Sequence, residues 1–430
     1  MKRFIILIAI FFSVNIHADY YGYKQPKDYE FNRGITLDSG YRMLQTSNRA
    51  MENFAIDVRD SATIIFDYGD KYMEDPWQRF LYSCVYNTCL YPINHSLMYS
   101  HHEFGHATRY RSFGLNASYL NSKFEDIGDN YFSMFGALIK DSFSKRDEDN
   151  DIGAATLAWS NWGRGSIEDL SQEAYFNFVT AAGGLNNQSQ IAKRWEDEVW
   201  YNSGSHIMSY NFFYVYDKSY SSIYSILEKN HEKKYLDQDQ IGSDIKIIVE
   251  AYQDMNIDVT RDDIILYGIL PVFMSSQFWA LIIDYYDYMI TGDKYTKAPE
   301  CDGIRFPNTS VYYTTSGITY QFNSGYRLND HWMFPISIEA VVKGDEGYEI
   351  SAGARYIGKD FYIHGEGVYN LKKLEYGGTI YSGYKIHKNI EIQAGCTYHN
   401  VETFLGERNI PSTQNLTTNI ETWFAMKFLL

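Results

Sequence analysis

Three residues that could bind a metal ion and transfer a proton lie close together in the sequence: His102, Glu103 and His106, spaced as H-E-x-x-H. In a helix, residues i and i+4 lie on one face, so the two imidazoles can reach a common ion. Zinc binds imidazole nitrogen at about 2.0–2.1 Å and lowers the pKa of a bound water to about 7. Glu103 projects from the same turn and is placed to take a proton from that water. The motif therefore predicts a Zn²⁺ site with Glu103 as general base.

The flanking sequence favours the helix that this motif requires. Apolar residues recur at helical spacing from Ser96 to Arg111. Gly105, inside the motif, costs about 1 kcal/mol of helix propensity relative to Ala, and a small residue there indicates close packing against a neighbour. The residues that can start or stop this helix are Pro92, Asn94, Ser96 and Gly114.

The motif resembles that of the zincin metallopeptidases. The resemblance implies that His102 and His106 are zinc ligands, that Glu103 is the general base, and that the substrate is a peptide or protein. It does not extend to the C-terminal part of the chain. The longer metzincin pattern adds a Gly and a third His, and Arg109 and Ser112 stand at those positions here, so this subclass is excluded.

The likeness to gluzincins within this group implies that the third ligand is a Glu on a later helix. Glu173, followed by Ala174, lies at the edge of an apolar stripe in the helical pattern from Ser166 to Ala182. A half-buried carboxylate needs a partner, so Glu173 is the predicted third ligand. The pair Gly183–Gly184 is predicted to end this helix. The alternatives for the third ligand are Glu168, Asp169, Glu125, Asp129 and His206.

The two parts of the chain differ in periodicity. Residues 40–290 show mainly helical spacing, which includes a further segment from Gln190 to Trp200. Residues 305–430 alternate apolar and polar positions, as in the run from Tyr348 to Tyr356, and turn residues divide them into seven or eight segments. This predicts an antiparallel meander, and eight strands can close into a small barrel.

The C-terminal meander resembles outer-membrane β-barrel proteins. It is rich in Tyr, it alternates apolar with polar residues, and it ends on an alternating strand that contains Phe424, Met426 and Phe428. Lipid on one side and a polar interior on the other require this pattern. The resemblance implies membrane association through the β domain. A soluble β-sandwich or a lipocalin-like barrel remains the alternative.

The N-terminal residues and the net charge of the chain indicate where the protein is located and which partners it can bind. Lys2 and Arg3 precede an apolar run from Phe4 to Val14, and Ala18 ends a cleavage site, which is typical of a secretory signal peptide. A membrane anchor is the alternative. The net charge of -16, from 38 Lys and Arg against 54 Asp and Glu, argues against nucleic-acid binding. An exported protein of the cell envelope is expected, in the outer membrane or otherwise periplasmic or secreted.

The segment Ile264 to Ile283 has no charged residue and is long enough to cross a bilayer. Pro271 and the acidic residues at both ends favour instead a pair of core helices that is broken near Pro271.

These patterns predict an α+β protein of several domains. A signal peptide (1–18) precedes a mainly helical, zincin-like domain (19–300) and an antiparallel β domain (301–430). The predicted function is an exported zinc-dependent hydrolase, a metallopeptidase. The alternatives are a zinc hydrolase that acts on another amide bond, and a non-enzymatic outer-membrane β-barrel protein whose helical domain binds a partner or acts as a plug.

Overall fold

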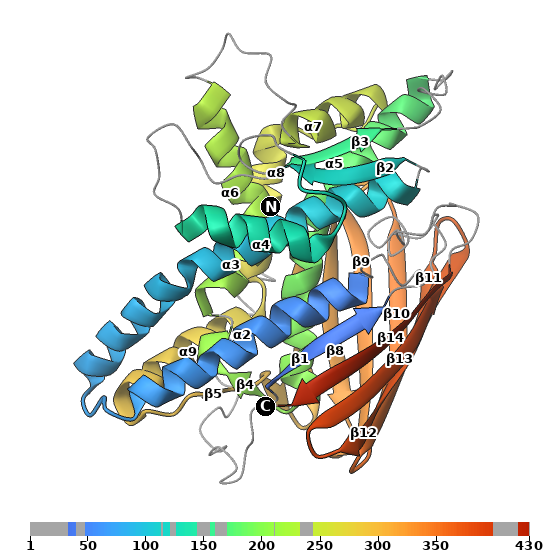
Figure 1. The fold of residues 1–430 in the computed structure, drawn as a ribbon. Coiled ribbons are helices and arrows are strands. Elements are labelled where there is room, and N and C mark those ends of the chain that lie inside the picture. The colour runs from blue at the N-terminus through green and yellow to red at the C-terminus, as the bar shows by residue number, and fades with distance from the viewer. Residues whose placement is uncertain are drawn as a thin grey trace, which may run out of the picture.

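The structure is a computed structural model that describes residues 33–39, 48–112, 115–120, 126–143, 155–159, 170–209, 211–232, 244–398 and 420–429. The predicted signal peptide (1–18) lies outside these residues. Helices dominate before residue 300 and strands after it (Figure 1), which confirms the predicted α+β class. The helices are α2 (Asn48–Asp70), α3 (Pro76–Ser112), α4 (Tyr131–Phe143), α5 (Leu170–Tyr201), α6 (Asn211–Glu232), α7 (Asp244–Asp254), α8 (Arg261–Phe273) and α9 (Ser276–Thr291).

Ten strands form one antiparallel sheet, in the order β1-β14-β13-β12-β11-β10-β9-β8-β7-β6. They are β1 (Gly34–Ser39), β6 (Glu300–Cys301), β7 (Ile304–Thr314), β8 (Gly317–Arg327), β9 (Trp332–Gly344), β10 (Tyr348–Ile357), β11 (Phe361–Asn370), β12 (Glu375–His387), β13 (Ile390–Tyr398) and β14 (Ile420–Leu429). Two short pairs complete the strands, β2 (Asn116–Leu120) with β3 (Ala155–Trp159), and β4 (Ser205–His206) with β5 (Tyr295–Thr296).

The sheet is curved but open, so the predicted eight-stranded barrel is wrong. Strands β1 and β6 lie at opposite ends of the order, and within the described residues no pairing joins them. Helices occupy the gap instead: α2 contacts β1, while α8 and α9 contact β7 (Figure 1). The meander pattern of the sequence predicts the strands, but it contains no signal for a helical wall between the two edges.

Hydrophobic clusters cross the predicted domain boundary. One cluster contains Phe178 of α5 and Tyr252 of α7 together with Val311 of β7 and Tyr320 of β8. The first strands of the sheet therefore pack directly on the helices. The sheet also takes β1 from the region before residue 300. The division into residues 19–300 and 301–430 stays a prediction.

Helix α5 is continuous where the sequence predicts a break. It runs from Leu170 to Tyr201 and passes through Gly183 and Gly184 without ending. A Cβ on Gly183 would lie 2.7 Å from the carbonyl oxygen of Gly105 in α3, and a Cβ on Gly105 would lie 2.3 Å from that of Gly183. The glycines are needed because the two helix backbones touch there. Close packing at Gly105 was predicted, and this contact confirms it.

Helix α3 begins at Pro76, well before the predicted start near Pro92. Asp75 caps it, because its Oδ1 accepts a hydrogen bond of 2.9 Å from the backbone N–H of Gln78. The Gln78 side chain accepts one of 3.4 Å from the backbone N–H of Asp75. This reciprocal pair is a capping box, and Pro76 occupies the first helical position that Pro favours.

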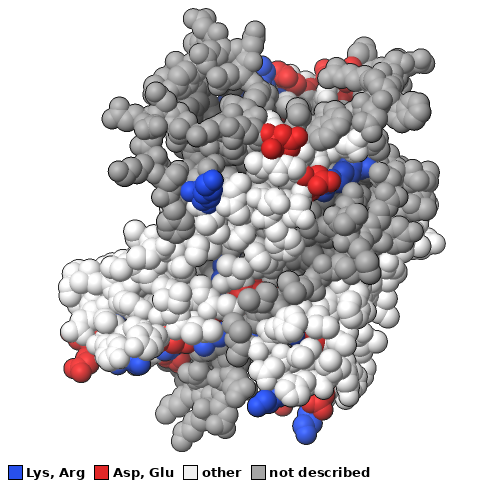
Figure 2. Space-filling view, in the orientation of Figure 1, with Lys and Arg blue, Asp and Glu red and all other residues white. Residues whose placement is uncertain are grey.

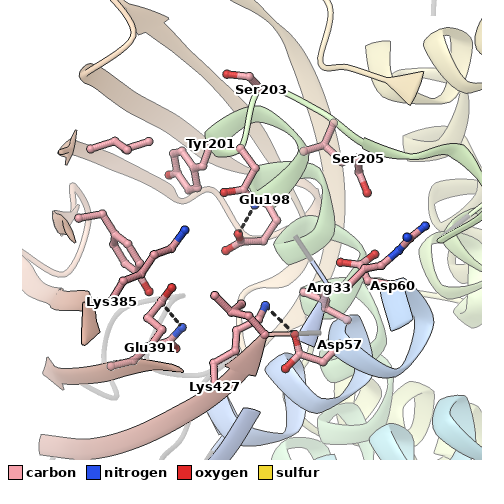
Figure 3. Close-up of a pocket in the computed structure, with 18 of the residues that line it drawn as sticks. Arg33, Asp57, Asp60, Glu198, Tyr201, Ser203, Ser205, Lys385, Glu391 and Lys427 are labelled. Atoms are coloured by element: carbon pink, nitrogen blue, oxygen red, sulfur yellow. Dashed lines mark hydrogen bonds and ion pairs between the residues drawn. The ribbon is translucent and has the colours of Figure 1, made fainter. Parts of the chain in front are cut away.

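The two faces of the sheet are unlike. On the inner face, charged side chains are buried and paired with the helices: Arg305 Nη1 lies 2.8 Å from Asp197 Oδ1 of α5, and Lys427 Nζ lies 2.9 Å from Asp57 Oδ1 of α2. A polar cavity of about 520 Å³ lies on this side, between the sheet and helices α2 and α5 (Figure 3). The outer face carries exposed apolar side chains, among them Ile336, Ile350 and Ile380.

The segment from Ile264 to Ile283 forms the predicted pair of helices. Helices α8 and α9 meet at a bend of 54° after Phe273, just beyond Pro271. Among the described helices, none is by itself long and apolar enough to cross a membrane, whereas this bent pair together has the length and composition. Leu266, Ile282 and Ile283 are exposed, so the pair is only partly the core element that was predicted.

The glycine contact between α3 and α5 gives a stability prediction. Replacing Gly105 by Ala should lower the free energy of unfolding by about 1–3 kcal/mol, because the new methyl group overlaps the α5 backbone. Gly136→Ala in α4 is the matched control: nothing lies within 4 Å of its Cβ position, and Ala stabilises a helix interior by about 0.5–1 kcal/mol. Urea unfolding followed by circular dichroism measures both changes. Equal effects at the two positions would contradict the contact.

Candidate metal centre

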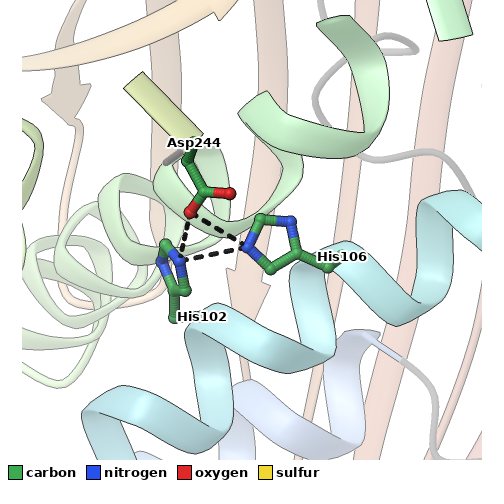
Figure 4. Close-up of side chains that lie close together, drawn as sticks. All are labelled: His102, His106 and Asp244. Carbon is green, nitrogen blue, oxygen red and sulfur yellow. Dashed lines mark hydrogen bonds and ion pairs between the residues drawn. The ribbon is translucent and has the colours of Figure 1, made fainter. Parts of the chain in front are cut away.

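His102 and His106 lie on the face of α3 that is turned toward α5 and α7. Their Nε2 atoms are 3.1 Å apart, with both rings turned inward (Figure 4). His102 is 3% exposed and His106 is 7% exposed, so both imidazoles are shielded from bulk water. The helical spacing of the motif therefore does what the sequence predicts: it brings two ligand atoms to one point.

Asp244, the first residue of α7, completes the group. Its Oδ2 lies 2.8 Å from the Nε2 of His102 and 3.3 Å from the Nε2 of His106 (Figure 4). Burial alone would raise the pKa of Asp244, but the charge of His106 and the hydrogen bonds with both rings hold it below its usual range. Asp244 therefore presents a carboxylate to the two imidazoles.

The donor set fits a zinc ion. A tetrahedral ion with bonds of about 2.0–2.1 Å separates its ligand atoms by about 3.3 Å, and the three separations here are 2.8, 3.1 and 3.3 Å. Two imidazoles and one carboxylate leave a fourth position open, as in catalytic zinc sites. The Asp244 side chain is 15% exposed, so the group is closest to solvent on that side.

Helix α5 supports the two rings from behind. The Nδ1 of His106 lies 2.7 Å from the carbonyl oxygen of Thr180. This bond places the proton on Nδ1 and leaves the Nε2 lone pair for a metal, which is the usual arrangement of metal-binding histidines. Gly184 lies against both rings: a Cβ there would be 2.5 Å from Cε1 of His102 and 2.7 Å from Nε2 of His106. The glycine therefore keeps room at the site.

The contacts of His106 also determine its pKa. Burial lowers its pKa, but the charge of Asp244 and the hydrogen bond with it outweigh burial and raise the pKa to about 9, with smaller contributions from Glu103 and Thr180. In the absence of a cation, the proton on the imidazole balances the carboxylate. A divalent cation at the same point would supply that positive charge.

Glu103, which lies between the two histidines in the motif, is buried. It is 6% exposed, and its charge contributes to the raised pKa of His106. Its role as the general base stays a prediction. Tyr110 follows His106 by one turn. Burial and the charges of Asp244 and Glu103 raise its pKa, and a side-chain hydrogen bond with Thr180 opposes them. Its hydroxyl is therefore protonated and bonded to Thr180. The sequence contains 40 Tyr residues, and no pattern in it distinguishes Tyr110.

Two more Tyr side chains lie next to the imidazole of His102. Tyr220 and Tyr224 of α6 have ring centroids 5.2 and 5.9 Å from that of His102. The two Tyr rings stack on each other with an interplanar angle of 12°. They form an aromatic wall next to the three ligand atoms.

Glu173, the predicted third ligand, is not brought to this group. It is exposed in the first turn of α5, and the three ligand atoms that converge come from His102, His106 and Asp244. Asp244 lies 138 residues after His106 in the sequence, counted as 244 minus 106. An Asp in the first turn of a helix is common, so its position gives no metal signal.

The other residues considered for the third ligand are not at the site either. His206 is buried and lies 3.2 Å from Asp67 Oδ1. Asp129 is exposed. Glu125, Glu168 and Asp169 lie outside the described residues. His101, next to the motif, is not part of the group: it is fully buried and stacks on the Tyr131 ring, and burial lowers its pKa well below the usual value.

The polar cavity of Figure 3 is separate from this group. The residues that line it do not include His102, His106 or Asp244. Several of its charged side chains form ion pairs, as Lys427 does with Asp57 and Arg194 with Glu198. The cavity is polar and lies between sheet and helices, and none of its described lining residues belongs to a metal-ligand set.

Comparison with known proteins adds no family to this description. No protein-family model matches the chain, and no curated protein or solved structure matches it. The geometry of His102, His106 and Asp244 is therefore what bears on function.

Proposed function

We propose that the chain is a zinc-dependent hydrolase, with a peptide bond as its substrate class. His102, His106 and Asp244 are the proposed zinc ligands, and Glu103 is the proposed general base. The convergence of three ligand atoms, separated by 2.8 to 3.3 Å, carries this proposal. Glu103 lies between two of these ligands in the H-E-x-x-H motif. Asp244 takes the role that the sequence pattern assigns to Glu173.

Each residue has a defined task in this proposal. Zinc, when bound, supplies a positive charge that lowers the pKa of a coordinated water to about 7. Glu103 accepts a proton from the attacking water and returns it to the leaving amine. Tyr110 donates a hydrogen bond to the oxygen that gains negative charge in the transition state. Thr180 and Gly184 hold the imidazoles in place through their contacts with the two rings.

A non-enzymatic binding protein is the alternative, and metal content separates the two. Buried His and Asp side chains also occur as purely structural hydrogen-bonded groups. Two observations favour the metal: three ligand atoms face one point, and Gly184 keeps space beside that point. A hydrolase for amides in lipid or cell wall would use the same residues, so substrate profiling must distinguish it.

The first prediction concerns the third ligand. The purified wild-type chain should contain one zinc per molecule by elemental mass spectrometry. Loss of a residue that hydrogen-bonds to a metal ligand typically lowers metal affinity roughly 10–100-fold. Asp244→Asn removes a ligand itself, so zinc affinity should fall by more than that. Glu173→Gln is the matched control and should retain the metal, because its side chain is exposed.

If Glu173→Gln loses the metal while Asp244→Asn keeps it, the ligand assignment is wrong. If metal-saturated wild-type protein retains no zinc after dialysis, the proposed function itself is overturned.

The second prediction concerns the general base. Glu103→Gln should keep its zinc and lose about a hundredfold to ten-thousandfold in kcat on a mixed peptide library, because no carboxylate remains to carry the proton. Tyr110→Phe should lose less, since one hydrogen bond to the transition state disappears. Product formation by mass spectrometry measures both, with Glu173→Gln as the active control. Full turnover by zinc-loaded Glu103→Gln would rule out this mechanism.

A further inference from the structure

The outer face of strands β9 to β14 is free of charge. Its positions are every second residue in the ranges 332–340, 348–356, 361–369, 376–384, 390–398 and 420–428, and the strand pairings place them on one side of the sheet. None of them is Asp, Glu, Lys, Arg or His. Most of their large side chains are nevertheless exposed, with Ile336 at 47% and Ile380 at 54%.

The inner face of the same strands has the opposite character. Its charged and ionisable residues include Glu339, Glu349, Arg355, His364, Glu391 and Lys427, and all six are buried. Figure 3 shows Glu391 and Lys427 directed toward the helices. In a soluble sheet that packs on a core, apolar side chains point inward and polar ones outward. Here that order is inverted along all six strands.

Aromatic side chains border the outer face along two lines. One line contains Tyr348, Tyr369, Tyr376 and Tyr398; Tyr369 pairs with Tyr376, and the Tyr376 and Tyr398 rings are 5.8 Å apart. The other contains Trp332, Tyr356, Phe361 and Tyr384, with ring centroids 4.9 Å apart for Trp332 and Tyr356 and 5.5 Å apart for Tyr356 and Phe361. Mostly aliphatic and small residues fill the space between the lines, together with Phe334 and Phe424.

We propose that the outer face of β9 to β14 contacts the hydrocarbon of a lipid bilayer, with the two aromatic lines at the two bilayer surfaces. Aromatic rings are enriched at both surfaces of membrane strands. From Tyr348 to Tyr356 the strand advances eight residues, or about 27 Å at 3.3–3.4 Å per residue. At the usual tilt this gives about 20 Å along the bilayer normal, comparable with the apolar band of about 25 Å in membrane strands.

The edges of the open sheet are covered by helices, which a sheet in lipid requires. Unpaired backbone groups are too costly in hydrocarbon. Helix α2 lies on β1, and helices α8 and α9 lie on β7. These two helices also carry exposed apolar side chains, Leu266 on α8 and Ile282 and Ile283 on α9. Figure 2 shows an uncharged surface over the ends of α2, α3 and α9, with charged side chains along its lower edge and a few above it.

A lipid surface fits this face better than a second copy of the chain. Protein interfaces place polar residues around an apolar centre, and the two borders of this face are lined by aromatic rings instead. The area is also large: six strands about 4.8 Å apart and about 27 Å long cover about 600–700 Å². The largest apolar patch on a soluble monomer is typically about 300–600 Å².

Vesicle flotation tests this inference and does not depend on the zinc site. Full-length chain should float with vesicles of phosphatidylethanolamine and phosphatidylglycerol. Ile336→Arg and Ile380→Arg together should lower the ratio of bound to free protein by roughly thirtyfold or more, because both lie midway between the aromatic lines. Leu374→Arg is the matched control: Leu374 is 67% exposed in the turn between β11 and β12, beyond Tyr376. It should bind within about twofold of wild type.

Fluorescent labels at positions 380 and 374 give a second test, which does not require the chain to fold with an added charge. In a chain whose four native cysteines are serine, an NBD fluorophore on Ile380→Cys should be quenched by brominated acyl chains, and one on Leu374→Cys should not. Wild-type protein that stays free of vesicles, or equal quenching at both sites, would overturn the proposal. So would a dimer in detergent-free buffer that Ile380→Arg dissociates, because a second copy would then cover this face.

Discussion

The direct contact of two helix backbones, α3 against α5, is the constraint on which the metal centre depends. Gly105 and Gly183 let the helices approach until the carbonyl oxygen of each fills the space where the other would carry a Cβ, and Gly184 leaves room for the two imidazoles. This closeness brings the Thr180 carbonyl within reach of His106. It also keeps both imidazole rings against α5, so that they are directed toward α7. A larger residue at the crossing would separate the helices and tilt the rings away from each other.

How much the sequence predicts depends on how local each feature is. His102, Glu103 and His106 are found because a helix fixes their relative positions whatever surrounds them. The strands from β7 onward are predictable because apolar and polar residues alternate within each strand. Asp244 is not predictable, since only the packing of α7 on α5 brings it to the histidines. The same holds for the open sheet, where the helices that replace strand pairing are distant in sequence from the edges they cover.

Local signals can also mislead when they serve tertiary packing. Gly183 and Gly184 have the composition of a helix end, yet they lie in the middle of α5 because the neighbouring helix needs the space. The capping box at Asp75 and Gln78 is a local signal of the usual kind, and it marks the start of α3 more reliably than Pro92 does. The inverted faces of the sheet follow from alternation alone, but which face points inward is decided by the helices.

Helix α7 contributes its first residue to the proposed metal centre and follows residues 233–243, which lie outside the described part of the chain. A cation held by Asp244 and the two histidines would link α7 to α3 across more than a hundred residues. Loop closure over such a length carries a large entropy cost that a bound ion offsets. Chelation would remove the ion and leave only the ion pair of Asp244 with the two imidazoles between the start of α7 and α3, while the glycine contact still held α3 to α5.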